Sequence, residues 1–265
     1  MYKIVLSLIG LLLGSVSYAS HNGPELLLLH GALFTAEGWH KVQTSLTQNG
    51  HQSTAIDLPG RNGDLTSPKA INLLTASKRV CEFISTRSDP VILVGHSQGG
   101  AVITQAVAMC PSQIKALVYI AAVVPKSGEL PFDRLTKKDN EMFDRCATYD
   151  DLEKVYRVNR FGPLWQAFMA DLSKQEAEIW AQKMVAEPSE IGNTRLDYSM
   201  SEFERIPKFY VETTRDLIIS PETQKEIQKG VRFVETYSIN SSHSPFLSQP
   251  ETVSRLLVEV KKYLH

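Results

Sequence analysis

The stretch Val91–Ala101 reads Val-Ile-Leu-Val-Gly-His-Ser-Gln-Gly-Gly-Ala, and the rest of the chain can be interpreted around it. The four consecutive apolar residues 91–94 predict a strand that is buried on both faces of a parallel sheet. Gly95-His96-Ser97-Gln98-Gly99 follows at once, and residues 101–109 suit a helix. Strand, G-x-S-x-G and helix in this order are typical of a turn that presents a serine nucleophile. Glycines are expected beside the serine because side chains there would collide with neighbouring backbone. The alternative is a glycine-rich turn with an ordinary surface serine.

Length and composition indicate a single globular unit. The chain has 265 residues, which fits one large α/β domain or a domain with an insertion. Apolar residues make up 43% and charged residues 22%, which is ordinary for a soluble protein. The net charge of −1 provides no basic surface for nucleic acid or for an anionic membrane. Composition therefore excludes a nucleic-acid partner and selects no other.

The N-terminal residues have the pattern of an export signal. Lys3 gives a short positive start, and Ile4–Leu13 is an apolar run that is too short to span a bilayer comfortably. Ser17-Tyr18-Ala19 has the small-x-small pattern of a cleavage site. We interpret residues 1–19 as a signal peptide cleaved after Ala19. The mature protein is then expected to be secreted or periplasmic, without a stable membrane anchor.

Cys81, Cys110 and Cys146 are an odd number of cysteines without metal-ligand spacing. In an oxidising compartment one pair could close and leave one thiol free. Cys81 with Cys110 is a candidate pair, since both fall on predicted helices that flank the strand 91–94. Buried unpaired cysteines are the alternative.

Strands and helices alternate along most of the chain. The predicted strands are Leu26–Leu29, Ser53–Asp57, Val91–Val94, Ala116–Ala121, Pro207–Thr213 and Val231–Thr236. The predicted helices are Trp39–Asn49, Ile71–Thr86, Ala101–Met109, one between Ser220 and Gly230, and a last one that Ser248 caps and that runs to about Leu264. This alternation predicts an α/β fold with a mostly parallel sheet and helices on both faces.

The alternation is interrupted by residues 126–204, which are more charged and mostly helical in pattern, with no strand signal. Ser173-Lys174-Gln175-Glu176 is a capping box that opens a helix there. We interpret residues 126–204 as a helical cap inserted between two parts of the core, 20–125 and 205–265.

A serine hydroxyl is a weak nucleophile unless a base accepts its proton, so Ser97 requires a histidine. His243 lies in the loop after the last predicted strand, at the sheet edge where ligand loops gather. His96 adjoins Ser97 on a tight turn and is poorly placed to deprotonate it. His30 is expected to order the backbone of the first loop. His243 is therefore the candidate base, and a solvated loop histidine is the alternative.

The base in turn needs a carboxylate that fixes its tautomer. Asp216 lies just after a predicted strand, and the order Ser97, Asp216, His243 is the order found in enzymes with a G-x-S-x-G elbow. Glu212 lies inside the strand, and Asp197 belongs to the cap, where a solvated surface residue is the simpler interpretation. Asp216 is the candidate acid.

Further groups would surround a reacting ester. Backbone N–H groups of Gln98, directly after the serine, and of Ala32, in the loop after the first strand, are candidate donors to an oxyanion. Trp165, Phe168 and Trp180 of the cap could line an apolar acyl or alcohol pocket. Ordinary helix packing is the alternative for these three aromatic residues.

With these residues in place, the chain resembles the α/β-hydrolases, and within them the small-ester branch of plant methyl esterases, hydroxynitrile lyases and related bacterial esterases. The matching segments cover nearly all of Leu26–Leu264 and are Leu28–Ala32 with Trp39, Asp57–Gly60, Val94–Gly100, Tyr210–Thr213 leading to Asp216, and His243–Phe246. The resemblance implies that Ser97 is the nucleophile, His243 the base and Asp216 its orienting acid. It also implies that Ala32 and Gln98 supply the oxyanion donors.

Two departures from the resemblance bear on the reaction. Similar lyases carry a lysine directly after the catalytic histidine, where this chain has Ser244, and a threonine after the first strand's histidine, where it has Gly31. We therefore expect a serine hydrolase that cleaves small carboxylic esters through an acyl-enzyme, without a metal or organic cofactor. The alternatives are a hydroxynitrile lyase, an amidase or an acyltransferase on the same fold, and a non-catalytic ligand-binding protein.

Overall fold

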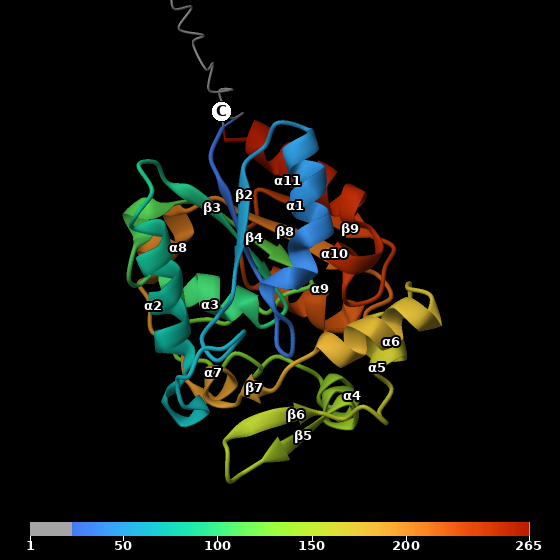
Figure 1. Ribbon diagram of the computed structural model, residues 1–265. Coiled ribbons are helices and arrows are strands. Elements are labelled where there is room, and N and C mark those ends of the chain that lie inside the picture. Colours follow the sequence, from blue (N-terminus) through green and yellow to red (C-terminus); the bar gives the residue numbers. More distant parts are fainter. Residues whose placement is uncertain (1–22, 265) are drawn as a thin grey trace, which may run out of the picture.

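The computed structural model describes residues 23–264, so the predicted signal peptide at residues 1–19 lies outside the described part. The described residues contain a six-stranded sheet in the order β2-β1-β3-β4-β8-β9, in which every neighbouring pair is parallel (Figure 1). Its strands are β1 (Leu26–Leu29), β2 (Ser53–Ile56), β3 (Val91–His96), β4 (Ile114–Ile120), β8 (Lys208–Thr213) and β9 (Glu235–Ile239). The strand order reverses at β1, between β2 and β3. In open parallel sheets, ligands bind at the carboxyl ends of the strands beside such a reversal.

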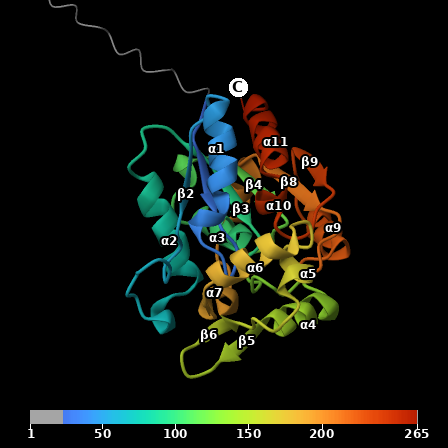
Figure 2. The same ribbon diagram turned by 45° about the vertical axis from the view of Figure 1, so that its right-hand side comes forward.

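Helices cover both faces of this sheet. The core helices are α1 (His40–Gln48), α2 (Leu73–Ile84), α3 (Gly99–Ala106), α8 (Met200–Arg205), α9 (Pro221–Lys229), α10 (Pro245–Ser248) and α11 (Pro250–Lys262). Short 3-10 turns are η1 (Ala36–Trp39), η2 (Pro68–Ala70) and η3 (Pro111–Gln113). α1 packs on α11, and α2 packs on α3 on the opposite side of the sheet (Figures 1 and 2). The predicted α/β fold with helices on both faces is confirmed.

The central strands are apolar because both of their faces are covered. All residues of β1 and β3 are buried, which is the arrangement predicted from their unbroken apolar runs. The last strand differs from the prediction, since β9 is Glu235–Ile239 rather than Val231–Thr236. β9 is an edge strand with alternating exposure, so it has no apolar run to mark it. The final helix also starts later than predicted, because Ser248 ends α10 and α11 begins at Pro250.

Residues 126–193, up to the end of α7, lie beyond the carboxyl ends of the core strands, whereas α8 lies beside the sheet (Figure 1). They contain α4 (Lys137–Cys146), α5 (Leu164–Phe168), α6 (Lys174–Lys183) and α7 (Glu190–Asn193). They also contain an antiparallel sheet of β5 (Ala147–Asp150), β6 (Val155–Val158) and β7 (Glu187–Pro188), so the expectation of a cap without strands is wrong. The rings of Tyr149 and Tyr156 pair across β5 and β6 at 5.3 Å. Thr148, Asp150 and Arg157 are polar residues within β5 and β6, so a search for apolar runs does not find these strands.

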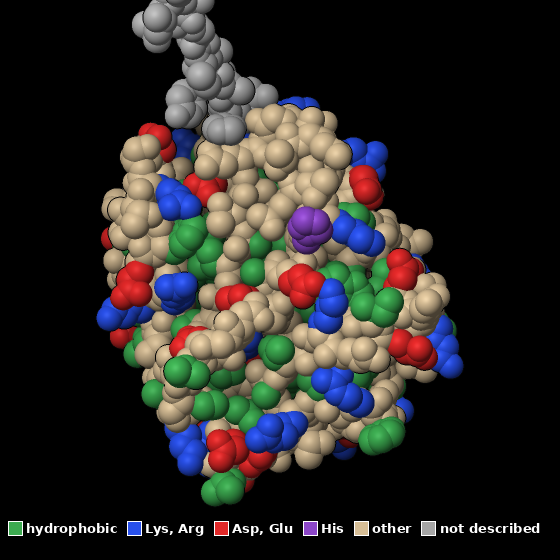
Figure 3. Space-filling view, in the orientation of Figure 1, with side chains coloured by type: hydrophobic (Ala, Val, Ile, Leu, Met, Phe, Trp, Pro, Cys, Tyr) green, Lys and Arg blue, Asp and Glu red, His purple; other side chains and the backbone are tan. Residues whose placement is uncertain are grey.

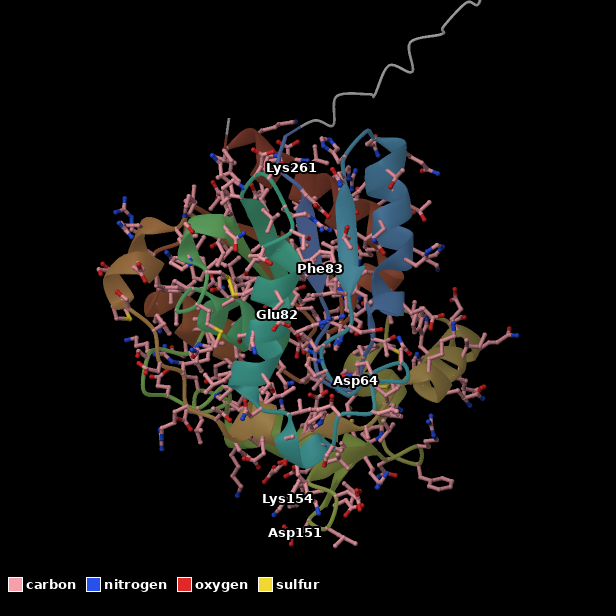
Figure 4. The ribbon with its side chains drawn as sticks, turned by 60° about the vertical axis from the view of Figure 1, so that its left-hand side comes forward. Asp64, Glu82, Phe83, Asp151, Lys154 and Lys261 are labelled. Carbon is pink, nitrogen blue, oxygen red and sulfur yellow. A yellow bond between two sulfur atoms is a disulfide. The ribbon has the colours of Figure 1, made fainter. Side chains whose placement is uncertain are left out.

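A disulfide joins Cys81 of α2 to Cys110, which directly precedes η3 (Figure 4). Cys81 and Cys110 are the candidate pair named from the sequence. Cys146 remains a buried free thiol. Burial raises the pKa of the Cys146 thiol to about 12. The disulfide therefore fastens α2 to the segment that follows α3, the helix after the serine turn.

Charges of both signs are interspersed on the surface seen in Figure 3. No helix within residues 23–264 is long and apolar enough to cross a membrane.

Candidate active site

Ser97 lies on the turn between β3 and α3 and has a φ of 53°, in the left-handed region that most residues avoid. Such a conformation costs about 1–3 kcal/mol and is found mainly at functional sites. A Cβ on Gly95 would lie 2.6 Å from the carbonyl oxygen of Gly99. A Cβ on Gly99 would lie 2.8 Å from the carbonyl oxygen of His30. The glycines beside Ser97 are therefore needed for close backbone approach, as predicted.

Asp216 and His243 come from the loops after β8 and β9, and both are buried. His243 Nδ1 donates to Asp216 Oδ2 over 2.7 Å. Asp216 also accepts from Thr213 Oγ1 at 2.9 Å and from the N–H groups of Ile218 and Ile219 at 2.8 and 3.0 Å. With Nδ1 as the donor, the lone pair of the His243 ring is on Nε2. Within residues 23–264 this buried nitrogen has no hydrogen-bond partner.

The loop of His243 is tied directly to the Ser97 turn. His96 Nε2 donates to the carbonyl oxygen of His243 over 2.9 Å, and the two imidazole rings are 4.6 Å apart. No hydrogen bond joins Ser97 to His243 in the described structure, and such bonds are often long in enzymes without substrate. The structure thus pairs Asp216 with His243 and places both beside the turn that carries Ser97.

His30 and His96 are fully buried and neutral. His30 Nδ1 donates to the carbonyl oxygen of Gly31 at 2.9 Å, and its Nε2 accepts the N–H of Leu58 at 3.1 Å. Burial, with a contribution from the Arg61 charge, lowers the pKa of His30 to about 3. Burial and the neighbouring His243 hold the pKa of His96 well below its usual value. His30 therefore orders the backbone of the first loop, as the sequence predicted.

Ala32 and Gln98 line the same cavity as Ser97. The cavity has a volume of about 100 Å³. Neither the N–H of Ala32 nor that of Gln98 donates a hydrogen bond to another residue in the part of the chain that the structure describes. Two free amides beside a serine can stabilise an oxyanion.

Most of the cavity wall is apolar and is shared between core and cap. Its lining residues are Ala32, Ser97, Gln98, Phe132, Leu135, Asn140, Phe143, Asp144, Tyr156, Phe168, Glu187, Pro188, Ser189, Gly192, Asn193, Ile218 and Ile219. Of the three cap aromatics named from the sequence, Phe168 lines the cavity, with its ring 5.4 Å from that of His243. Trp165 and Trp180 do not line it. Trp165 instead donates from Nε1 to the carbonyl oxygen of Leu172 at 3.1 Å.

Three carboxylates of the cap, which the sequence did not reveal, each contact a different loop of the core; Asp139 and Glu187 are buried, and the side chain of Asp171 is 7% exposed. Asp139 accepts the N–H of Ser220, at the start of α9, at 3.2 Å. Asp171 accepts the N–H of Ser242, the residue before His243, and pairs with Arg215. Glu187 contacts the loop after β1 and the Ser97 turn. Partners so far apart in the chain leave no local pattern, so a single sequence offers no signal for these contacts.

A parallel sheet with a strained serine turn, and with acid and histidine on later loops, defines the α/β-hydrolase class of site. The model of the alpha/beta hydrolase family matches residues 26–256. The chain belongs to the alpha/beta hydrolase family.

Comparison with known proteins places this chain near plant methylesterases. Methylesterase 7 of Arabidopsis thaliana is 27% identical over 252 residues, covering 91% of this chain and 97% of the relative. A solved pyrethroid hydrolase from Sphingobium faniae matches with a TM-score of 0.78 at 22% identity, over 90% of this chain and 97% of that one. A solved Arabidopsis methylesterase matches with a TM-score of 0.77 at 21% identity, over 91% of this chain and 99% of that one. The predicted resemblance to methyl esterases is confirmed.

Proposed function

We propose that this protein is a serine esterase that hydrolyses small carboxylic esters through an acyl-enzyme. One observation carries the proposal: His243 is oriented by Asp216 through Nδ1 at 2.7 Å, and its buried Nε2 is left without a partner. A free imidazole nitrogen beside a strained serine is the arrangement that activates a hydroxyl for attack. Similarity to methylesterases supports a carboxylic ester as the substrate.

The proposed reaction has two steps. Ser97 Oγ attacks the ester carbonyl while His243 Nε2 accepts its proton, and the N–H groups of Ala32 and Gln98 stabilise the oxyanion. His243 then donates the proton to the departing alcohol. Water, deprotonated by the same nitrogen, releases the acid and restores Ser97. Asp216 stabilises the imidazolium that forms in each step.

Sterics at Gly31 support hydrolysis over cyanohydrin cleavage. A Cβ on Gly31 would lie 2.6 Å from Ser97 Cβ and 2.8 Å from His96 Nδ1, so the threonine of similar lyases does not fit this backbone. Ser244, at the position of their lysine, is buried and uncharged. The site therefore lacks both residues that the resemblance associates with lyase chemistry.

Replacement of the nucleophile tests the proposal. Ser97→Ala should lower turnover of p-nitrophenyl acetate and butyrate by about 10⁴-fold or more. A fluorophosphonate should label the wild-type protein at Ser97 and should not label the variant. The matched control is Ser112→Ala, at an exposed serine, which should leave both measurements unchanged. Turnover retained in Ser97→Ala, or a wild-type protein that neither labels nor hydrolyses, would refute the esterase.

A further inference from the structure

Glu187, on β7 of the cap, is a buried carboxylate in the wall of the cavity that Ser97 lines. Its Oε2 accepts the N–H of Leu33 at 2.9 Å and forms an ion pair with the guanidinium of Arg61. Its Oε1 accepts from Gln98 Nε2 at 2.7 Å. Both carboxylate oxygens are therefore bound to core residues.

These partners lie on both sides of the proposed oxyanion hole. Leu33 directly follows Ala32, and Gln98 is itself the second candidate donor. Leu33 has a φ of 67°, so the loop after β1 adopts a left-handed conformation at the residue that Glu187 holds. Arg61 extends the contact, since its Nε donates to the carbonyl oxygen of Phe34 at 3.3 Å. One carboxylate thus binds the backbone of Leu33, the neighbour of Ala32, and the side chain of Gln98, and the N–H groups of Ala32 and Gln98 must converge on one point.

The ion pair with Arg61 also explains why the carboxylate of Glu187 is tolerated near the ester carbonyl oxygen, on which negative charge develops. An unpaired carboxylate in this wall would repel the oxyanion, and Arg61 compensates its charge. Buried ion pairs are weak evidence for stability, because well-packed apolar residues often stabilise a fold equally well. The contacts of this pair with residues 33, 34 and 98 point to a role at the site.

We propose that Glu187 is a positioning residue for the oxyanion hole, which it reaches from the cap by holding the backbone at Leu33 and the side chain of Gln98. The inference rests on the proposed esterase function. Glu187 does not take part in bond making or breaking. Glu187 instead keeps the N–H groups of Ala32 and Gln98 aligned. These N–H groups stabilise the negative charge that develops on the carbonyl oxygen in the transition state.

The test compares Glu187→Ala, Glu187→Gln and Arg61→Met in the full protein with p-nitrophenyl acetate. Loss of one oxyanion donor costs about 10²–10³ in kcat in other hydrolases, so misalignment should cost about 10–100-fold. We expect Glu187→Ala to lower kcat by that amount with little change in KM. Glu187→Gln keeps an acceptor for Leu33 and should recover most of the loss. Arg61→Met leaves a bare carboxylate beside the oxyanion and should lower kcat more than Glu187→Gln does.

The matched control is Glu129→Gln in the same cap. Glu129 accepts the N–H of Lys126 at 2.8 Å and pairs with Arg134 at 2.9 Å, but it does not line the cavity. This variant loses a partly exposed carboxylate–arginine pair of the cap and should keep the wild-type kcat. Melting temperatures measured in parallel report structural damage, and Gln98→Met replaces Glu187→Ala if the latter does not fold.

The outcomes separate the two proposals. Unchanged kcat in Glu187→Ala, a loss confined to KM, or an equal loss in Glu129→Gln would overturn the positioning role while the wild type remains an esterase. A wild type that neither hydrolyses esters nor reacts with a fluorophosphonate would overturn the esterase itself. A selective loss of kcat that glutamine reverses supports the positioning role.

Discussion

At the scale of single residues, three buried histidines lie near the turn of Ser97, and each has different hydrogen-bond partners. His243 pairs with a carboxylate, His96 donates to a carbonyl oxygen, and His30 bridges two backbone segments. Position in the chain was enough to predict which one faces the acid, because the order of elbow, acid and base is shared by elbow enzymes. The partner of Glu187 could not be predicted, since Arg61 lies 126 residues away.

His30 should make the protein sensitive to acid. Its pKa is about 3 in the fold against 6.5 in the unfolded chain, so between these values the unfolded chain binds more protons and stability falls as pH falls. Each pH unit below 6.5 should remove about 1.4 kcal/mol for this residue. Urea unfolding at pH 7 and pH 5 measures the effect, and His30→Gln should be less pH-dependent by about 2 kcal/mol over this interval.

The control for this effect is His40→Gln, at an exposed histidine, which should keep the pH dependence of the wild type. Equal pH dependence of wild type and His30→Gln would contradict a neutral buried His30.

At the scale of elements, the sequence predicted best where burial is complete. β1 and β3 were predicted from unbroken apolar runs, and α6 from a capping box in which Ser173 accepts the N–H of Glu176. β5, β6 and β9 were missed because they have only four or five residues and mix apolar with polar side chains. An alternation over so few residues is a weak signal for a strand.

The disulfide should stabilise the element pair that it joins without affecting catalysis. Cys81 and Cys110 are 29 residues apart, and closing such a loop restricts the unfolded chain by about 3–4 kcal/mol. The double variant Cys81→Ala/Cys110→Ala should lose about that much unfolding free energy in urea. Its kcat should match the wild type, because neither cysteine lines the cavity.

Cys146→Ala provides the control, since this thiol is buried but unpaired. Reductant should destabilise wild type and Cys146→Ala alike and should leave the double variant unchanged. A double variant as stable as the oxidised wild type would show that the bridge contributes nothing.

At the scale of the whole molecule, the cavity between core and cap limits the substrate. Its volume of about 100 Å³ is below the ~300–1,000 Å³ of typical ligand pockets. Short acyl chains should therefore be preferred, and kcat/KM for p-nitrophenyl butyrate should exceed that for the octanoate by at least about tenfold. A series of p-nitrophenyl esters from acetate to octanoate measures this. Equal values of kcat/KM along the series would mean that the cavity expands to accept longer acyl chains.

The three cap carboxylates have a consequence for engineering and for evolution by recombination. A cap grafted from a related hydrolase would have to bring its own acceptors for the N–H groups of Leu33, Ser220 and Ser242. A graft without them would leave these amides and the guanidinium of Arg61 without their partners, a large penalty for buried groups. Chimeras that exchange residues 126–204 should thus succeed only when the incoming cap carries carboxylates at the positions of Asp139, Asp171 and Glu187. In this protein the cap is not an interchangeable module.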